Sequence, residues 1–165
     1  MRKCVALALL SLFVAACQNI SCPLDNVVML SVGTYADGES VRVGDTLTVT
    51  MAGTDSVLLN RLCNFNSFQV PLRQQASGTL TDTLFLHWSL SVPAGEEAEE
   101  RVDTLFVEHA CRIHFESIDC PSTVFHDVKT AGCSRQMLDS VSISNPLVDY
   151  EHYENLRLHF SVVPE

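Results

Sequence analysis

The sequence predicts an all-β fold, an antiparallel β-sandwich of the immunoglobulin-like or a related type, with a small β-barrel as the alternative. Apolar and polar residues alternate with period two along most of the chain, and no long stretch repeats at the helical period of 3.6. Turn residues such as Ala36-Asp37-Gly38 and Asn145-Pro146 separate the alternating segments. Half-buried antiparallel strands produce this combination, because one face of each strand packs on the core and the other meets water.

Nine segments carry this strand pattern, six by alternation and three as shorter apolar stretches. In order along the chain they are Val27–Val32, Thr46–Met51, Val57–Leu59, Phe68–Leu72, Thr83–Val92, Leu105–Phe115, Thr123–Val128, Ser140–Ser144 and Leu156–Val162. The clearest alternation lies in the fifth segment, where one side carries Leu84, Leu86, Trp88, Leu90 and Val92. A strand that alternates so regularly buries one face, so Trp88 is predicted to be a core residue.

Turn residues are expected to close most of these strands. Further breaks are predicted at Val43-Gly44-Asp45, Gly53-Thr54-Asp55 and Ser77-Gly78. Pro93-Ala94-Gly95 followed by the acidic run Glu96–Glu100 predicts an exposed hairpin loop. The run lacks the alternating Asp, Asn and Gly of a calcium loop, so we expect it to be a solvated loop tip.

The first part of the chain is typical of a bacterial lipoprotein signal peptide. Arg2 and Lys3 precede the apolar run Val5–Ala16, which is too short for the roughly 20 residues that span a bilayer. The run ends in Val14-Ala15-Ala16-Cys17, and small residues before a cysteine are typical of a lipoprotein processing site. Cys17 is therefore predicted to be acylated, to begin the mature chain and to bind it to the lipid bilayer.

Length and composition predict one exported domain. Residues 1–16 form the signal peptide, residues 17–23 a lipidated tether, and residues 24–165 a single β-sandwich domain. Removing the signal peptide takes away two of the ten basic residues and no acid, so the formal net charge changes from −10 to −12. Such an acidic surface repels nucleic acid and anionic headgroups, so we expect no nucleic-acid partner and membrane contact through the lipid alone.

Seven cysteines have to be assigned. Cys4 lies in the signal peptide and Cys17 carries the lipid. The remaining five are Cys22, Cys63, Cys111, Cys120 and Cys133. Disulfides persist in an oxidising compartment, so at least one is expected, and the odd number leaves at least one thiol unpaired or paired between molecules. Spacing by itself leaves the connectivity open.

Five strand-and-turn segments form a recognisable set. They are "GTDSVLLNR" at Gly53–Arg61, "FQVPL" at Phe68–Leu72, "HFESIDCP" at His114–Pro121, "LDSVSISNP" at Leu138–Pro146 and "LRLHF" at Leu156–Phe160. As a set they resemble a family of uncharacterised lipoproteins from Bacteroides-type bacteria. The resemblance implies a small lipid-anchored β domain of unknown function and a Cys22–Cys120 disulfide, with Cys63, Cys111 and Cys133 outside the family pattern. It carries over no active-site residue.

The same resemblance implies a location in the cell envelope, anchored to the outer membrane. In such bacteria, an acidic stretch soon after the acylated cysteine resembles a signal for export to the cell surface. Residues Gln18–Ser21 contain no acid, which favours the periplasmic face.

Six histidines raise the hypothesis of a metal site. His87, His114 and His159 are predicted to point away from the apolar faces of their strands, and they could bind Zn²⁺ or Cu²⁺ if those strands were neighbours. None of the six has the H-x₃₋₅-H or HExxH spacing, so the stronger expectation is that no cofactor binds. His109 falls on the apolar side and is expected to be a core histidine bonded to backbone.

Catalytic signatures are absent from the sequence. There is no G-x-S-x-G elbow, and Ser56 beside Asp55 makes no dyad because adjacent strand residues face opposite sides. We therefore expect no enzyme but a non-catalytic binding or structural module with a possible protein partner in the envelope, since β-sandwiches offer loops and edge strands to partners. The alternative is an envelope module that binds a metal or is associated with carbohydrate.

Overall fold

The structure is a computed structural model that describes residues 22, 28–54, 56–90 and 99–161. Eleven strands and no helix lie within these residues. The strands are β1 (Met29–Ala36), β2 (Glu39–Ser40), β3 (Thr46–Met51), β4 (Val57–Leu62), β5 (Ser67–Pro71), β6 (Ser77–Ser89), β7 (Glu100–His114), β8 (Thr123–Cys133), β9 (Ser140–Ile143), β10 (Leu147–Val148) and β11 (Leu156–Phe160). The all-β prediction is confirmed.

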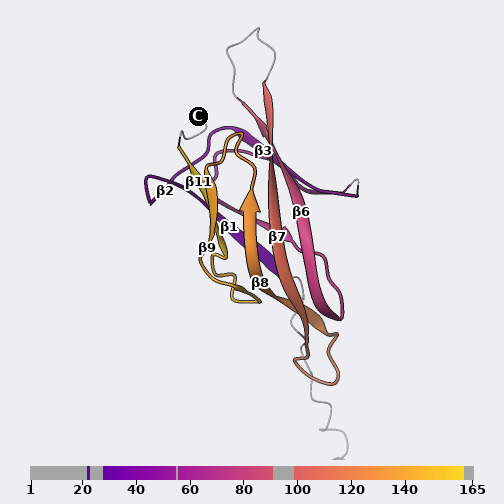
Figure 1. The fold of residues 1–165 in the computed structure, drawn as a ribbon. Helices are drawn as coiled ribbons and strands as arrows, with labels where there is room; N and C mark the ends of the chain where they lie inside the picture. The colour runs from indigo at the N-terminus through magenta and orange to yellow at the C-terminus, as the bar shows by residue number, and fades with distance from the viewer. Residues whose placement is uncertain (1–21, 23–27, 55, 91–98, 162–165) are drawn as a thin grey trace, which may run out of the picture.

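The strands form two sheets that pack face to face (Figure 1). The first sheet has the order β2-β1-β11-β9, with β5 also pairing with β1, and the second has the order β10-β8-β7-β6-β3-β4. The long strands β6, β7 and β8 form the middle of the second sheet, where each residue from Ser77 to Ser89 has a partner in β7. Two separate sheets make this a sandwich, as predicted, and not the alternative closed barrel.

The antiparallel arrangement is confirmed except at one pair. β1 and β11 lie parallel, with Val32 opposite Leu156, whereas every other pairing between the described strands is antiparallel. These two strands lie at opposite ends of the domain, so no short hairpin turn fixes their relative direction. Period-two patterning carries no information about strand direction, and the sequence therefore could not reveal this pair.

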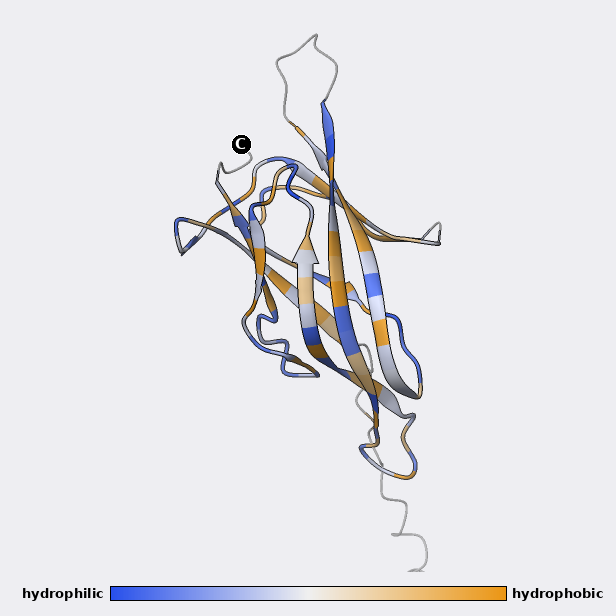
Figure 2. Cartoon of the chain, viewed as in Figure 1, coloured by the Kyte–Doolittle hydropathy of each residue, from blue (hydrophilic) through white to orange (hydrophobic). Residues whose placement is uncertain are grey.

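Alternation along the strands builds the core between the two sheets. The apolar sides predicted for Thr46–Met51, Phe68–Leu72 and the first part of Thr83–Val92 are buried as expected. Trp88 is fully buried and meets Phe160 of the opposite sheet edge-to-face, with ring centroids 5.6 Å apart. Figure 2 shows apolar bands alternating with polar ones along β6 and β7. The contact between Trp88 and Phe160 joins the two sheets near the ends of β6 and β11.

Local expectations differ from the structure at several positions, and Ile113 and Ile143, predicted on apolar strand faces, are 37 % and 38 % exposed. Ser77-Gly78 is the beginning of β6 and not a turn, because Gly78 takes a left-handed φ of 104° while it remains paired with Cys111. Phe115, predicted to share the buried face of its strand, is 66 % exposed because β7 ends at His114. Val92, Val162 and most of the acidic loop Glu96–Glu100 lie outside the described residues.

The disulfide implied by the family resemblance is present. Cys22 and Cys120 are bonded, with their Cα atoms 5.5 Å apart, and the bond joins the beginning of the chain to the β7–β8 connection. Cys63, Cys111 and Cys133 are free thiols. The signal peptide and Cys17 lie outside the described residues, and the described part contains no helix long and apolar enough to cross a membrane.

Candidate metal centre

The three histidines of the sequence-based metal hypothesis have separate partners. His87 on β6 lies 2.8 Å from Glu100 and 3.2 Å from Thr50, measured between side-chain atoms. His114 at the end of β7 stacks on Phe125, with ring centroids 4.3 Å apart. His159 on β11 lies in the other sheet, where its Nε2 is 2.9 Å from the Ser142 hydroxyl. The structure does not bring the three imidazoles together.

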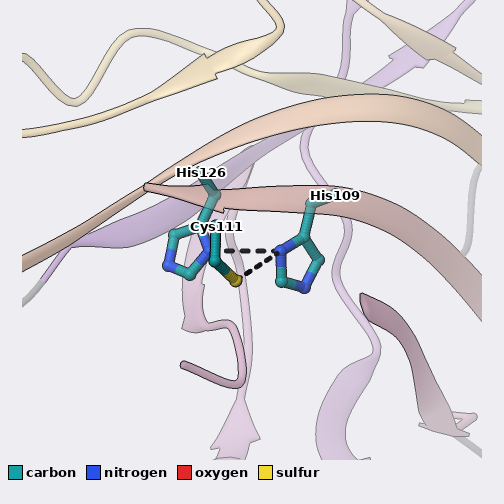
Figure 3. A group of neighbouring side chains, drawn as sticks. All are labelled: His109, Cys111 and His126. Atoms are coloured by element: carbon teal, nitrogen blue, oxygen red, sulfur yellow. Dashed lines mark hydrogen bonds between the residues drawn. The ribbon is translucent and has the colours of Figure 1, made fainter. Parts of the chain in front are cut away.

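A different group of side chains does converge. His109 and Cys111 lie two residues apart on β7 and therefore point to the same face, and His126 on β8 is the register partner of Cys111. Figure 3 shows the three side chains turned toward one another. The Cys111 Sγ lies 3.7 Å from Nδ1 of each histidine, and the two Nδ1 atoms are 3.1 Å apart. All three residues are buried.

Asp82 on the neighbouring strand β6 holds the outer nitrogen of His109. Its Oδ2 lies 3.3 Å from His109 Nε2 and also accepts a hydrogen bond from the Arg73 backbone N–H at 2.8 Å. The Arg73 guanidinium donates to the other carboxylate oxygen, so both oxygens have donors. Asp82 is fully buried, while the Arg73 side chain is about half exposed and links the cluster to the surface.

The electrostatics of the cluster favour a charged Asp82 and a neutral His126. Burial would raise the pKa of Asp82, but hydrogen bonds from His109 and Arg73 outweigh it and hold the pKa at about 2. The pKa of His126 is lowered to about 4, chiefly by burial and also by the electrostatic effect of His109, while attraction to Asp82 opposes both. At neutral pH the His126 ring is therefore uncharged, which is the form that binds metals.

The three inner atoms have the spacing of a metal site. A point equidistant from Sγ and the two Nδ1 atoms lies about 2.0 Å from each of them, close to a Zn–N bond of about 2.0–2.1 Å and somewhat inside a Zn–S bond of about 2.3 Å. The Asp82 carboxylate behind His109 is the outer partner that metal-binding histidines commonly have, since it fixes the tautomer and raises ligand basicity.

As a purely protein network the cluster is costly. His126 Nε2 is buried and finds no hydrogen-bond partner among the described residues. An unsatisfied buried polar group costs about 1–3 kcal/mol, and thiol contacts at 3.7 Å offer little in return. A cation bound between Sγ and the two Nδ1 atoms would replace these weak thiol contacts, whereas His126 Nε2 lies on the other side of its ring and gains no partner from it.

Cys111, His109 and Asp82 also form a chain of thiol, imidazole and carboxylate, the order found in cysteine nucleophile sites. Such a thiol has to meet its substrate. Cys111 is only 6 % exposed and faces two imidazoles, so a substrate carbonyl has no approach to its sulfur. The geometry fits ligation better than attack on a substrate.

Sequence reasoning missed this cluster although part of its signal was visible. Burial of His109 was predicted correctly, but its described partners are the Asp82 carboxylate and the His126 ring and not backbone. The spacing His109-Ala110-Cys111 puts two ligand types on one face of a strand, and this was the available signal. His126 and Asp82 joined the group only through strand pairing.

Fold and cluster together define a class, a small β-sandwich module whose larger sheet buries two histidines and a cysteine that could hold a metal ion. Residues 46–160 match the model of a family of unknown function, DUF6452, and the chain belongs to this family. The matched range contains the whole cluster, whereas β1 and Cys22 precede it. No curated protein and no solved structure matches the chain. The resemblance to a family without known function is thus confirmed, and lipid attachment and bacterial origin stay predictions.

Proposed function

We propose that this protein is a lipid-anchored, non-catalytic module of the cell envelope that binds one transition-metal ion at His109, Cys111 and His126. The observation that carries the proposal is the triangle of Sγ and two Nδ1 atoms, with sides of 3.7, 3.7 and 3.1 Å. Imidazole and thiolate are the ligands that zinc, copper and related ions prefer in proteins. Metal binding was the alternative function predicted from sequence, with other residues.

A binding role without catalysis fits the depth of the cluster. His109 and His126 are 0 % and 1 % exposed, so a bound ion would be shielded from water and from substrates. Catalytic metal sites keep an open position for water or substrate, whereas structural and carrier sites are enclosed by protein. The ion would therefore be held as cargo or as part of the structure, not as a Lewis acid acting on a substrate.

The anchoring part of the proposal rests on the signal sequence. The apolar run Val5–Ala16 and Cys17 predict acylation, and the partner of the modified chain is then the lipid bilayer at the periplasmic face of the outer membrane. The Cys22–Cys120 disulfide supports an oxidising compartment, because cytosolic thiols are kept reduced. It would also keep the lipidated end close to the β7–β8 connection, since Cys17 precedes Cys22 by five residues.

Metal content of the full chain, purified in detergent from its host envelope, tests the proposal. We expect inductively coupled plasma mass spectrometry to find about one transition-metal ion per chain. The ion is expected to be lost in Cys111→Ser and His126→Ala. The matched controls are His114→Ala, which removes a more exposed histidine of the same strand, and Cys63→Ser, which removes an exposed thiol. Both controls are expected to keep the ion.

Circular dichroism of each variant shows whether the sandwich is still folded, so loss of metal can be separated from loss of structure. A folded wild-type chain that contains no metal, and takes up none from zinc or copper solutions, would contradict the metal-binding part. A product without acyl groups at Cys17, seen by intact mass, would contradict the anchoring part independently.

A further inference from the structure

We infer that the ion at His109, Cys111 and His126 is monovalent copper, held by three ligands. This inference rests on the proposed metal-binding function and adds the identity and charge of the ion. It is carried by three features of the site, namely the charge balance of its buried groups, the number of donor atoms around it, and the softness of the thiolate.

The charge balance favours a single positive charge. Metal-bound Cys111 is a thiolate with charge −1, and His109 and His126 are neutral as ligands. The nearest other charge, the Asp82 carboxylate, is already paired with the Arg73 guanidinium, which donates to its Oδ1. Cu⁺ therefore makes the buried site neutral, whereas Zn²⁺ or Cu²⁺ leaves an excess positive charge among side chains that are at most 6 % exposed. Unbalanced charge is strongly disfavoured at such burial.

The number of donors favours three-coordination. Among the described residues the metal-ligand group contains three members, each offering one atom. The Arg73 carbonyl oxygen lies 3.9 Å from the Cys111 sulfur, and a carbonyl oxygen is a harder and weaker donor to a soft metal ion than thiolate or imidazole. Asp82 faces the outer nitrogen of His109 and is engaged there. Structural zinc sites are almost always four-coordinate and tetrahedral, so this site is one ligand short for zinc.

The ligand chemistry points the same way. Thiolate is a soft donor that selects Cu⁺ over harder ions, and trigonal sites with two histidines and one cysteine are typical copper geometry, with a carbonyl oxygen as a weak and distant axial neighbour. Cys111 and both histidines supply the three donors of such a trigonal site. Neutral charge, three strong donors and a soft sulfur together distinguish monovalent copper from zinc.

Competition between the two ions tests the inference. A chelator first removes bound metal from the full chain. The metal-free chain is then titrated without oxygen, once with Cu⁺ in competition with a coloured Cu⁺ chelator and once with Zn²⁺ in competition with a coloured Zn²⁺ chelator. Ascorbate keeps the copper reduced and leaves the Cys22–Cys120 disulfide intact. We expect one Cu⁺ per chain, at least 100-fold tighter than Zn²⁺, and an X-ray absorption spectrum of one sulfur and two nitrogen ligands.

Each other result has a defined meaning. One tightly bound Zn²⁺ that Cu⁺ does not displace would overturn the copper inference and leave the proposed metal-binding function standing. Copper bound with four strong ligands would overturn the three-ligand geometry. If neither ion bound to the folded chain, both the inference and the proposed function would fail.

Variants connect the binding to these residues. Cys111→Ser is expected to weaken Cu⁺ binding by at least 100-fold, and Asp82→Asn, which leaves the three ligands in place, by about 10–100-fold. Thermal denaturation checks that each variant is folded. His87→Ala removes a histidine with partners outside the cluster and is expected to change the affinity by less than twofold. Equal Cu⁺ affinity in wild type and folded Cys111→Ser would assign the ion to another site.

Discussion

At the scale of single residues, the unusual feature is a pair of buried imidazoles in the middle of a β-sheet. His109 and His126 meet edge-to-face with ring centroids 4.8 Å apart, and only His109 has a charged partner, Asp82. Two histidines at this depth destabilise the metal-free chain unless both rings stay neutral or one shares its charge with the carboxylate. The two histidines that we propose as metal ligands are therefore costly for folding of the metal-free chain.

The pH dependence of stability follows from the same groups. In the metal-free chain the unfolded state protonates His126 near pH 6.5, but the folded state does so only near pH 4. The unfolded state binds more protons between these values, so the free energy of unfolding falls as the pH drops, by about 3 kcal/mol. Asp82, shifted from 3.8 to about 2, continues the loss below pH 4. Urea titrations at several pH values, with a chelator present, measure this slope.

The matched variant for this prediction is His126→Leu, which replaces the titrating ring by an apolar side chain of similar bulk. Its stability is expected to change much less than that of the wild type between pH 6.5 and pH 4. His114→Ala, which removes a half-buried histidine outside the cluster, is the control and should keep the wild-type slope. Parallel curves for the wild type and His126→Leu would contradict the assignment.

Three cysteines are free among the described residues, and they are predicted to react at different rates. Cys63 is exposed, Cys111 is buried in the cluster, and Cys133 is partly buried, where burial and the nearby Asp103 carboxylate raise the pKa of its thiol. Because the thiolate is the reactive form, we expect alkylation in the order Cys63, Cys133, Cys111 at pH 8. Timed labelling with iodoacetamide and peptide mass spectrometry measure the order. Labelling of Cys111 before Cys63 would show that the cluster is open to solvent.

At the scale of elements, Asp103 on β7 joins the second sheet to the connection between β8 and β9. Its buried carboxylate accepts hydrogen bonds from the indole of Trp88, the hydroxyl of Ser134 and three consecutive backbone N–H groups, those of Gln136, Met137 and Leu138. The Asp103 side chain thus accepts the hydrogen bonds of three turn N–H groups that lie outside the strands. This arrangement fixes the path by which the chain crosses from one sheet to the other.

Asp103→Ala is predicted to be among the most damaging single substitutions in the domain. It leaves the buried Trp88 indole and Leu138 N–H without an acceptor and removes the part-buried bonds to Gln136 and Met137, so we expect a loss of about 3–5 kcal/mol in the free energy of unfolding. Hydrogen exchange should also become faster at residues 136–138. The control is Asp127→Ala in β8, whose exposed carboxylate pairs only with Lys129 and is expected to contribute less than about 1 kcal/mol.

The strands themselves were largely predictable, and their exceptions have physical causes. Thr83–Val92 and Thr46–Met51 follow strict alternation because one face of each is buried against the opposite sheet. β2 and β10, with two residues each, carry too few side chains to show any period. Glycine is typical of turns, so the sequence predicts a turn at Gly78. In the structure Gly78 belongs to a paired strand.

At the scale of the whole molecule, the Cys22–Cys120 disulfide connects residues that are 98 positions apart. A closed loop of this length restricts the unfolded chain and is worth about 4–5 kcal/mol in the chain-entropy model. The bond also fixes Cys22 to the β7–β8 connection.

Replacing both bonded cysteines by serine is predicted to lower the melting temperature by roughly 10–20 °C, because a chain of this size loses about 2–4 °C per kcal/mol. Differential scanning calorimetry of the oxidised wild type and the double variant measures the change. Cys63→Ser, an exposed free thiol, is the control and should leave the melting temperature unchanged. Equal melting temperatures in wild type and double variant would show that the bond does not stabilise the fold.

Period-two patterning predicted the fold class, most of the strands and the burial of Trp88 and His109. It could do so because the alternation along each segment shows which strand face packs on the core. Only the tertiary structure decided which strands are neighbours. It paired β1 with β11 in parallel and placed His126 of β8 and Asp82 of β6 on either side of β7. Metal ligands act through distances across strands, and those distances are set by register and sheet order, which local patterning does not encode.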